Sequence, residues 1–193
     1  MVDRGRPTIR RPCDTRPGTA QNKRILMFDL PGVKTGSDLE TLFKAVGFVV
    51  VQWGFAEQSL DLTVATIFHR FTGDPLLKRR PQQLRAKTTF LRECLEQFAE
   101  LAPFKSEGDA LLTRFSDTAK TRNDLVHAAI ADLLAQGGTF TFSKIDVNQT
   151  DGHTVRSVAL ADSDWRAFRR ELLRLGKDGQ SFAKRVFDGL KAT

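Results

Sequence analysis

The chain has 193 residues, of which 40% are hydrophobic and 27% are charged, and its formal net charge is +7. This is the composition of an ordinary globular domain, with enough residues for one full core. No run of about 20 apolar residues occurs, which excludes a membrane span. The N-terminus lacks the apolar region of a signal peptide, and two cysteines predict neither a disulfide scaffold nor a zinc site. We therefore expect a protein of the reducing cytoplasm.

Most of the positive charge lies near the N-terminus. Residues 1–24 carry seven Lys or Arg against two Asp, so five of the seven net charges belong there and two to the other 169 residues. Prolines recur among these arginines, which is typical of a chain that does not fold alone. We expect a disordered basic tail over residues 1–30 and a helical domain over 31–193. Such a tail either binds RNA or an acidic partner without sequence preference, or is simply solvated.

The domain begins with a long helical pattern. The run Ser37-Asp38-Leu39-Glu40 has the form of a capping box. Apolar residues then recur at helical spacing as far as about Phe71. Gly47 and Gly54 favour a break or kink within this helix.

Acidic residues follow one another at turn spacing on the same helix. Trp53 and Glu57 are four residues apart, and Asp61 lies one further turn along. The two carboxylates are either solvated or face the helix that carries Arg122. In the second case they would place an acid beside the candidate site described below.

Two more helices are predicted in the middle of the chain. One runs from about Pro81, a residue suited to a first turn, to about Ala102. The other runs from about Glu107 to about Ala135, and Gly137 with its following glycine ends it.

A small β-hairpin is predicted before the last helix. β-branched and aromatic residues dominate 139–147 and 154–160, and an Asp-Gly turn signal separates these two runs. The hairpin therefore covers about 139–160. A two-stranded hairpin is marginal alone in water, so it has to lean on the helices or on a partner chain.

The last helix starts at Asp162 or Ser163, and we expect Gly176 and Gly179 to interrupt it. Arginines on its surface form a basic face, which is either solvated or follows an RNA backbone. The members of this face are Arg166, Arg169, Arg170 and Arg174. Taken together, the sequence predicts an all-α domain. It is a bundle of four to five helices with the hairpin inserted before the last helix and the basic tail in front.

The segment from Arg122 to His127 holds the strongest chemical signal. It places a permanent cation, the amide of Asn123 and an imidazole within six residues. An arginine and a histidine held together suit the stabilisation and protonation of a phosphate in reaction. Arg122 and His127 lie roughly 140° apart around a helix, so one helix alone is not expected to focus both on one atom. A second copy packed antiparallel across a two-fold axis would close a basic pocket.

A purely structural interpretation of the motif stays open. Arg122 falls on the buried stripe of its helix, and a buried arginine needs a partner. It either extends to the surface, lines a cleft or an interface, or pairs with Glu57 or Asp61 inside the bundle. In the last case His127 is a packed helix histidine.

Long helices with Arg-Asn-x-x-x-His late in a core helix resemble the HEPN superfamily. The signature of that superfamily is an Arg, usually followed by a polar residue, with four to six residues between the Arg and a His. Arg122, Asn123 and His127 match this signature. The Trp53-x-x-x-Glu57 pattern and the Ala that follows His127 are also similar to bacterial members. The resemblance covers roughly residues 37–190, and the hairpin is an addition to the plain bundle.

The resemblance implies a metal-independent endoribonuclease that needs no cofactor, with its site at a homodimer interface. Such proteins are often toxins of toxin–antitoxin or phage-defence systems, so an antitoxin protein is an expected partner. His127 would act as general acid or base, Arg122 would hold the charged phosphorane, and Asn123 would bond the phosphate or position His127. Glu57 and Asp61 are the supporting acids. The alternative is a non-catalytic dimeric helical module that binds RNA, a nucleotide or a protein partner.

Overall fold

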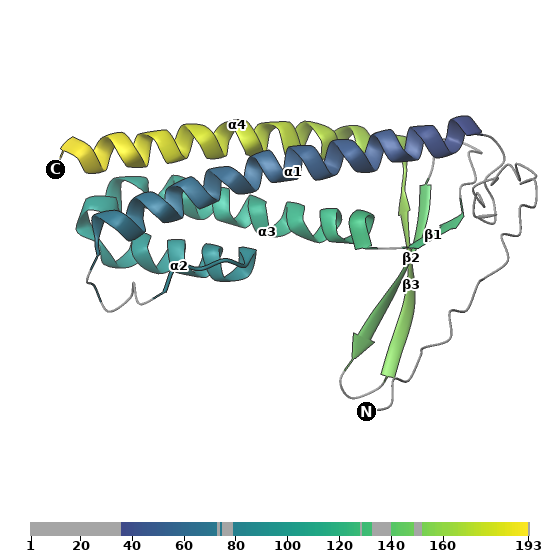
Figure 1. Ribbon diagram of the computed structural model, residues 1–193, viewed down its shortest axis with the longest axis horizontal. Coiled ribbons are helices and arrows are strands. Elements are labelled where there is room, and N and C mark those ends of the chain that lie inside the picture. The colour runs from purple at the N-terminus through teal and green to yellow at the C-terminus, as the bar shows by residue number, and fades with distance from the viewer. Residues whose placement is uncertain are drawn as a thin grey trace, which may run out of the picture.

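A computed structural model of the chain describes residues 36–72, 74, 79–127, 129–132, 140–148 and 152–192. The predicted tail over residues 1–30 and the predicted hairpin turn lie outside the described residues. Helices dominate the described part, which confirms the all-α class (Figure 1). Its helices are α1 (Gly36–Arg70), α2 (Leu84–Gln97), the 3-10 helix η2 (Ala99–Phe104), α3 (Lys105–His127) and α4 (Asp162–Ala192).

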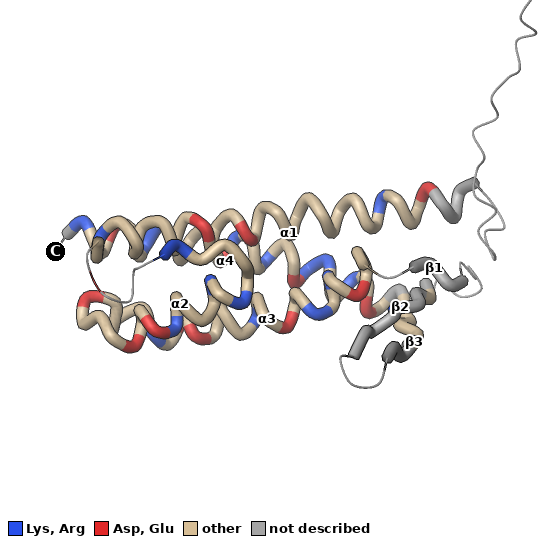
Figure 2. The backbone as a smooth tube through the Cα atoms, turned by 60° about the horizontal axis from the view of Figure 1, so that its bottom comes forward, with Lys and Arg blue, Asp and Glu red and all other residues tan. Residues whose placement is uncertain are grey.

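The two longest helices, α1 and α4, lie side by side (Figures 1 and 2). α3 packs on both of them, and α2 packs on α1 and α3. The core between these helices includes Phe115, which is fully buried, and Trp53, which is 5% exposed. The two rings meet edge to face with their centroids 6.1 Å apart. None of the described helices is apolar enough over sufficient length to cross a bilayer.

Glycines do not interrupt the long helices, so the predicted breaks are wrong. α1 continues through Gly47 and Gly54, because residues such as Val49 and Ala56 are buried on both sides of them. α4 likewise continues through its glycines. A Cβ on Gly176 would lie only 2.7 Å from Phe55 of α1. This glycine therefore permits close packing of α1 on α4 and does not end a helix.

The boundaries of α2 also differ from the prediction. The sequence predicts one helix to about Ala102, but α2 ends at Gln97 and a 3-10 helix follows over Ala99–Phe104. Pro103 lies inside that 3-10 helix. α2 ends because Phe98 has extended backbone, with φ −92° and ψ 119°.

α3 ends eight residues earlier than predicted, at His127 instead of Ala135. Within the predicted helical stretch, Ala129–Asp132 forms a strand, β1, that pairs antiparallel with β2 (Phe140–Asn148). Short apolar runs of this kind fit a strand or a helix equally well, and here the neighbouring strand decides. The candidate motif therefore lies in the last two turns of α3, next to the sheet.

A three-stranded antiparallel sheet follows α3, in the order β1-β2-β3, with β3 over Gly152–Leu160. β2 and β3 pair in simple register, from Phe140 opposite Leu160 to Asn148 opposite Gly152. These two strands occupy the predicted hairpin region, and β1 was not predicted. Lys144 of β2 forms an ion pair of 2.8 Å with Asp124 of α3. The sheet is thereby fixed directly to the helix segment that carries the motif.

Candidate functional site

The end of α3 brings all three motif side chains together. Nη1 of Arg122 donates a hydrogen bond of 2.9 Å to Oδ1 of Asn123. The same nitrogen lies 3.3 Å from Nε2 of His127. Asn123 and His127 are exposed and Arg122 is half-buried. A cation, an amide and an imidazole thus converge at one place on the surface.

Arg122 and His127 contact each other within one helix, which their separation of roughly 140° around the helix did not predict. Their positions on the helix are well apart, but the arginine side chain is long enough to cross the face between them. Arginine has no acceptor, so His127 Nε2 accepts in this contact and a neutral ring then carries its proton on Nδ1. Nε2 is thus the imidazole nitrogen that faces the guanidinium of Arg122.

Arg122 has an unusual set of neighbours for a half-buried arginine. Its Cζ lies 5.9 Å from the ring centroid of Trp53, within the range of a cation–π contact. Its Nε is buried and has no hydrogen-bond partner among the described residues. No carboxylate of the described part forms an ion pair with it. The structural interpretation that pairs Arg122 with Glu57 or Asp61 is therefore wrong.

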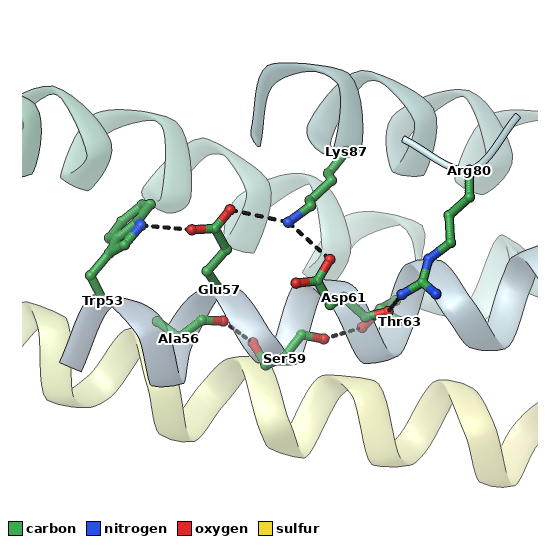
Figure 3. A network of polar contacts seen from close by, with 8 residues as sticks. All are labelled: Trp53, Ala56, Glu57, Ser59, Asp61, Thr63, Arg80 and Lys87. Atoms are coloured by element: carbon green, nitrogen blue, oxygen red, sulfur yellow. Dashed lines mark hydrogen bonds and ion pairs between the residues drawn. The ribbon is translucent and has the colours of Figure 1, made fainter. Parts of the chain in front are cut away.

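Glu57 and Asp61 instead share a lysine from α2, as Figure 3 shows. Nζ of Lys87 lies 3.1 Å from Oε1 of Glu57 and 2.9 Å from Oδ1 of Asp61. The lysine side chain is 5% exposed. Burial alone lowers the pKa of Lys87, but the hydrogen bonds to Asp61 and Glu57 outweigh burial and leave it raised. The two supporting acids therefore have Lys87, and not Arg122, as their ion-pair partner.

The sequence analysis missed Lys87, although a signal for it exists. It lies three residues after Leu84 and four before Leu91, which places it on the apolar stripe of α2. A lysine at such a position has to reach a buried partner or the surface. Its partners are Glu57 and Asp61, for which the sequence left open solvation or a position facing the Arg122 helix.

Trp53 connects the two polar clusters. Its Nε1 donates a hydrogen bond of 2.9 Å to Oε2 of Glu57, whose other oxygen accepts from Lys87 (Figure 3). The guanidinium of Arg122 lies over the ring of Trp53. Glu57 therefore reaches the candidate site through the indole of Trp53 and not by a direct bond.

The predicted basic face of α4 contains one arginine on aromatic rings. Cζ of Arg169 lies 4.7 Å from the ring centroid of Phe48 and 6.0 Å from that of Trp165. This arrangement connects α4 to α1 and accounts for Arg169 without a ligand.

Cys94 is buried, and burial raises the pKa of its thiol to about 12.

Comparison of the chain with protein-family models, with curated proteins and with solved structures gives no match. Within the described residues, no three His, Cys, Asp or Glu side chains come together as a set of metal ligands. The function of the site therefore has to be argued from its own geometry.

Proposed function

We propose that this protein is a metal-independent endoribonuclease of the HEPN type, in which Arg122, Asn123 and His127 act on a phosphodiester of RNA. The convergence of these three side chains at the end of α3 carries the proposal. A cation without a carboxylate partner among the described residues stands beside a histidine at an exposed position. That combination suits an anionic substrate whose protons have to be moved.

The chemistry follows from the groups present. Nε2 of His127 accepts the proton of the ribose 2′-hydroxyl, and the 2′ oxygen forms a bond to phosphorus. The bond between phosphorus and O5′ breaks, and O5′ receives a proton from a protonated imidazole, that of His127 in a second copy. The products are a 2′,3′-cyclic phosphate and a 5′-hydroxyl. Arg122 turns from His127 to the phosphate and stabilises the charge that develops on its oxygens.

RNA is the expected substrate because this reaction uses the 2′-hydroxyl, which DNA lacks. Asn123 bonds the phosphate or keeps His127 in position. An activity of this kind suits a toxin or a phage-defence effector, which an antitoxin protein would restrain.

An apolar face of α1 supports the proposed homodimer. α1 has an apolar run over residues 45–51, and the side of the helix that faces away from the core exposes large hydrophobic residues. These are Phe43, Val50, Val51, Phe55 and Leu62, here called the α1 stripe. A helix that is hydrophobic all round is normally buried, and exposed apolar patches mark interaction surfaces.

The order of residues in the α1 stripe is nearly symmetric about the point between Gln52 and Trp53. Antiparallel packing of two copies about that point places Val51 opposite Gly54 of the second copy. Phe43 then faces Leu62, and Val50 faces Phe55. Nothing lies within 4 Å of a Cβ built on Gly54, so a partner helix has room to approach.

Such self-complementarity is what a two-fold contact requires. Its centre falls beside Trp53, on whose ring Arg122 lies. Trp53 itself faces the core on the opposite side of α1, so this contact aligns the two copies along α1 but does not by itself close one pocket from both motifs.

The test is cleavage of labelled RNA in EDTA by the wild type and by His127→Ala, with His69→Ala as the control. His69 is an exposed histidine in the last turn of α1, far along the chain from the motif. We expect the wild type and His69→Ala to cleave equally. His127→Ala should lose about 10²–10⁴-fold in rate, because a general acid–base group is removed. The products should carry 2′,3′-cyclic phosphate ends.

Two outcomes would contradict the proposal. Equal cleavage by wild type and His127→Ala would show that the activity lies elsewhere. Absence of cleavage across several RNAs, combined with binding of those RNAs, would leave the non-catalytic dimeric module as the function.

A further inference from the structure

We infer that Trp53 is a positioning residue for Arg122, and that Glu57 and Lys87 hold the indole of Trp53 in the required orientation. The inference rests on the proposed function only in taking Arg122 as the group that meets the anionic ligand. It assigns a task to three residues outside the Arg-Asn-x-x-x-His motif.

The geometry leaves the Trp53 ring little freedom. The side chain is 5% exposed, and its ring meets the buried ring of Phe115 at 6.1 Å. Its only polar atom donates to Glu57 at 2.9 Å. Glu57 in turn accepts from the buried Lys87, as Figure 3 shows. The indole is therefore fixed both by packing and by a hydrogen bond to a carboxylate that is itself held.

The same hydrogen bond acts on the electrons of the ring. A carboxylate that accepts the indole N–H draws the proton toward itself and increases the electron density of the ring. The negative face of an aromatic ring attracts a guanidinium, and a more electron-rich face attracts it more strongly. Arg122 lies at such a face, with Cζ 5.9 Å from the centroid.

The stem of Arg122 is held while its outer end stays available. Nε is buried without a hydrogen-bond partner in the described part of the chain, so the ring of Trp53 is the electron-rich group that compensates this end of the guanidinium. Nη1 faces Asn123 and His127. Ordering a free arginine costs side-chain entropy. Trp53 moves that cost from the binding step to folding, which is preorganisation.

The experiment uses the two tryptophans of the chain as probe and control. Trp165→Phe leaves Trp53 as the sole fluorescent tryptophan and serves as the reference protein. A 2′-O-methyl RNA oligonucleotide, which binds but lacks a reactive hydroxyl, is titrated into it. We expect the emission of Trp53 to change as Arg122 meets the phosphate. The change should disappear when Arg122→Met is added to the same background.

Kinetics give the second readout, with Trp53→Phe compared with Trp165→Phe. Trp53→Phe keeps an aromatic ring against Phe115 but loses the N–H that Glu57 accepts. We expect kcat/KM for RNA cleavage to fall about tenfold, mainly through kcat, the size expected for a lost cation–π and hydrogen-bond arrangement. Glu57→Gln keeps the ring and its packing, and should show a smaller loss in the same direction. It replaces Trp53→Phe as the test if that variant fails to fold by circular dichroism.

The inference is overturned if the emission of Trp53 does not respond to the oligonucleotide, or responds equally without Arg122. It is also overturned if Trp53→Phe and Glu57→Gln both cleave RNA as fast as Trp165→Phe. A response that depends on Arg122 in a protein that cleaves no RNA would remove the proposed nuclease function. It would leave Trp53 as the positioning residue of an anion-binding arginine.

Discussion

Lys87 and Arg122, the two cations linked to Trp53, have different kinds of partners in this fold. Lys87 is buried and lies within 3.1 Å of two carboxylates. Arg122 is half-buried, has an amide, an imidazole and an aromatic ring as neighbours, and keeps one nitrogen without a partner in the described chain. The charge of Lys87 is satisfied within the protein, whereas the charge of Arg122 remains available to something outside it.

The difference in partners suggests different tasks for the Lys87 cluster and the Arg122 cluster. A buried cation with two acids connects α1 to α2, and its loss leaves two carboxylates without their counter-ion. An arginine with an unpaired buried nitrogen costs stability and is retained only where another demand outweighs that cost. The Lys87 cluster therefore contributes to the fold, and the Arg122 cluster is the one that we propose to meet a ligand.

Of the changes that test this comparison, Arg122→Met has the largest expected effect. We expect RNA cleavage to fall by about 10²–10³-fold, because the charge that stabilises the phosphorane is gone. The free energy of unfolding should stay equal or rise by about 1 kcal/mol, since an unsatisfied buried N–H is removed. Single-turnover cleavage and urea denaturation measure the two quantities. A clear loss of stability would show that Arg122 belongs to the fold.

Lys87→Met should have the opposite profile. We expect a loss of about 2 kcal/mol in the free energy of unfolding, less than for a fully buried pair because both carboxylates are partly exposed. Adding Glu57→Gln and Asp61→Asn should recover most of it. Lys184→Met, which breaks an exposed pair with Asp188, is the control and should change stability by less than about 0.5 kcal/mol. Equal effects of the two lysine variants would contradict the comparison.

Val51→Glu tests whether the Arg122 cluster needs a second copy of the chain for its activity while the Lys87 cluster does not. We expect it to dissociate the proposed dimer, because two carboxylates would be buried near the two-fold axis. Cleavage should fall with dimer content, and the Lys87 cluster should keep its contribution to stability. Sedimentation velocity measures the first effect. Leu173→Glu, an exposed apolar residue of α4, is the control that should stay dimeric.

The smallest effect is a dependence of stability on pH at the alkaline end. The pKa of Lys87 is raised above its ordinary 10.5 in the folded protein. The folded state therefore binds this proton more tightly than the unfolded chain. Its contribution is complete below pH 10.5 and is lost as the pH rises through the higher folded value. Urea midpoints of wild type should fall over that range more steeply than those of Lys87→Met, and parallel curves would contradict the assignment.

The ends of α1 and the presence of the motif on a helix were predictable from the sequence, whereas the continuity of α1 and α4 through their glycines was not. Capping signals and apolar spacing place the ends of α1 within one or two residues of those observed. The meeting of Arg122, Asn123 and His127 was only partly predictable. Their neighbourhood follows from spacing, but the reach of the arginine side chain across the helix face depends on its rotamer, which spacing does not determine.

Other features depend on contacts that are distant in the sequence. The strand Ala129–Asp132 has a composition that fits a helix, and only pairing with β2 decides its form. Lys87 comes 30 residues after Glu57, so their ion pair follows from how α2 packs on α1. Gly176 fits the pattern of a helix break, and its purpose becomes clear only where Phe55 approaches it.

The close fit of α1 on α4 at its glycines also fixes how the two helices can move. Sliding α4 by one turn, about four residues, would bring Leu172 or Gln180 against Phe55 in place of Gly176. Both residues have side chains that would clash with Phe55, so sliding of α4 along α1 is sterically blocked. α1, about 50 Å long by its 35 residues, and α4 thus form one rod of fixed register. A movement of the sheet can therefore be transmitted to the opposite end of the molecule by rotation or bending of the helix pair, but not by translation of one helix along the other.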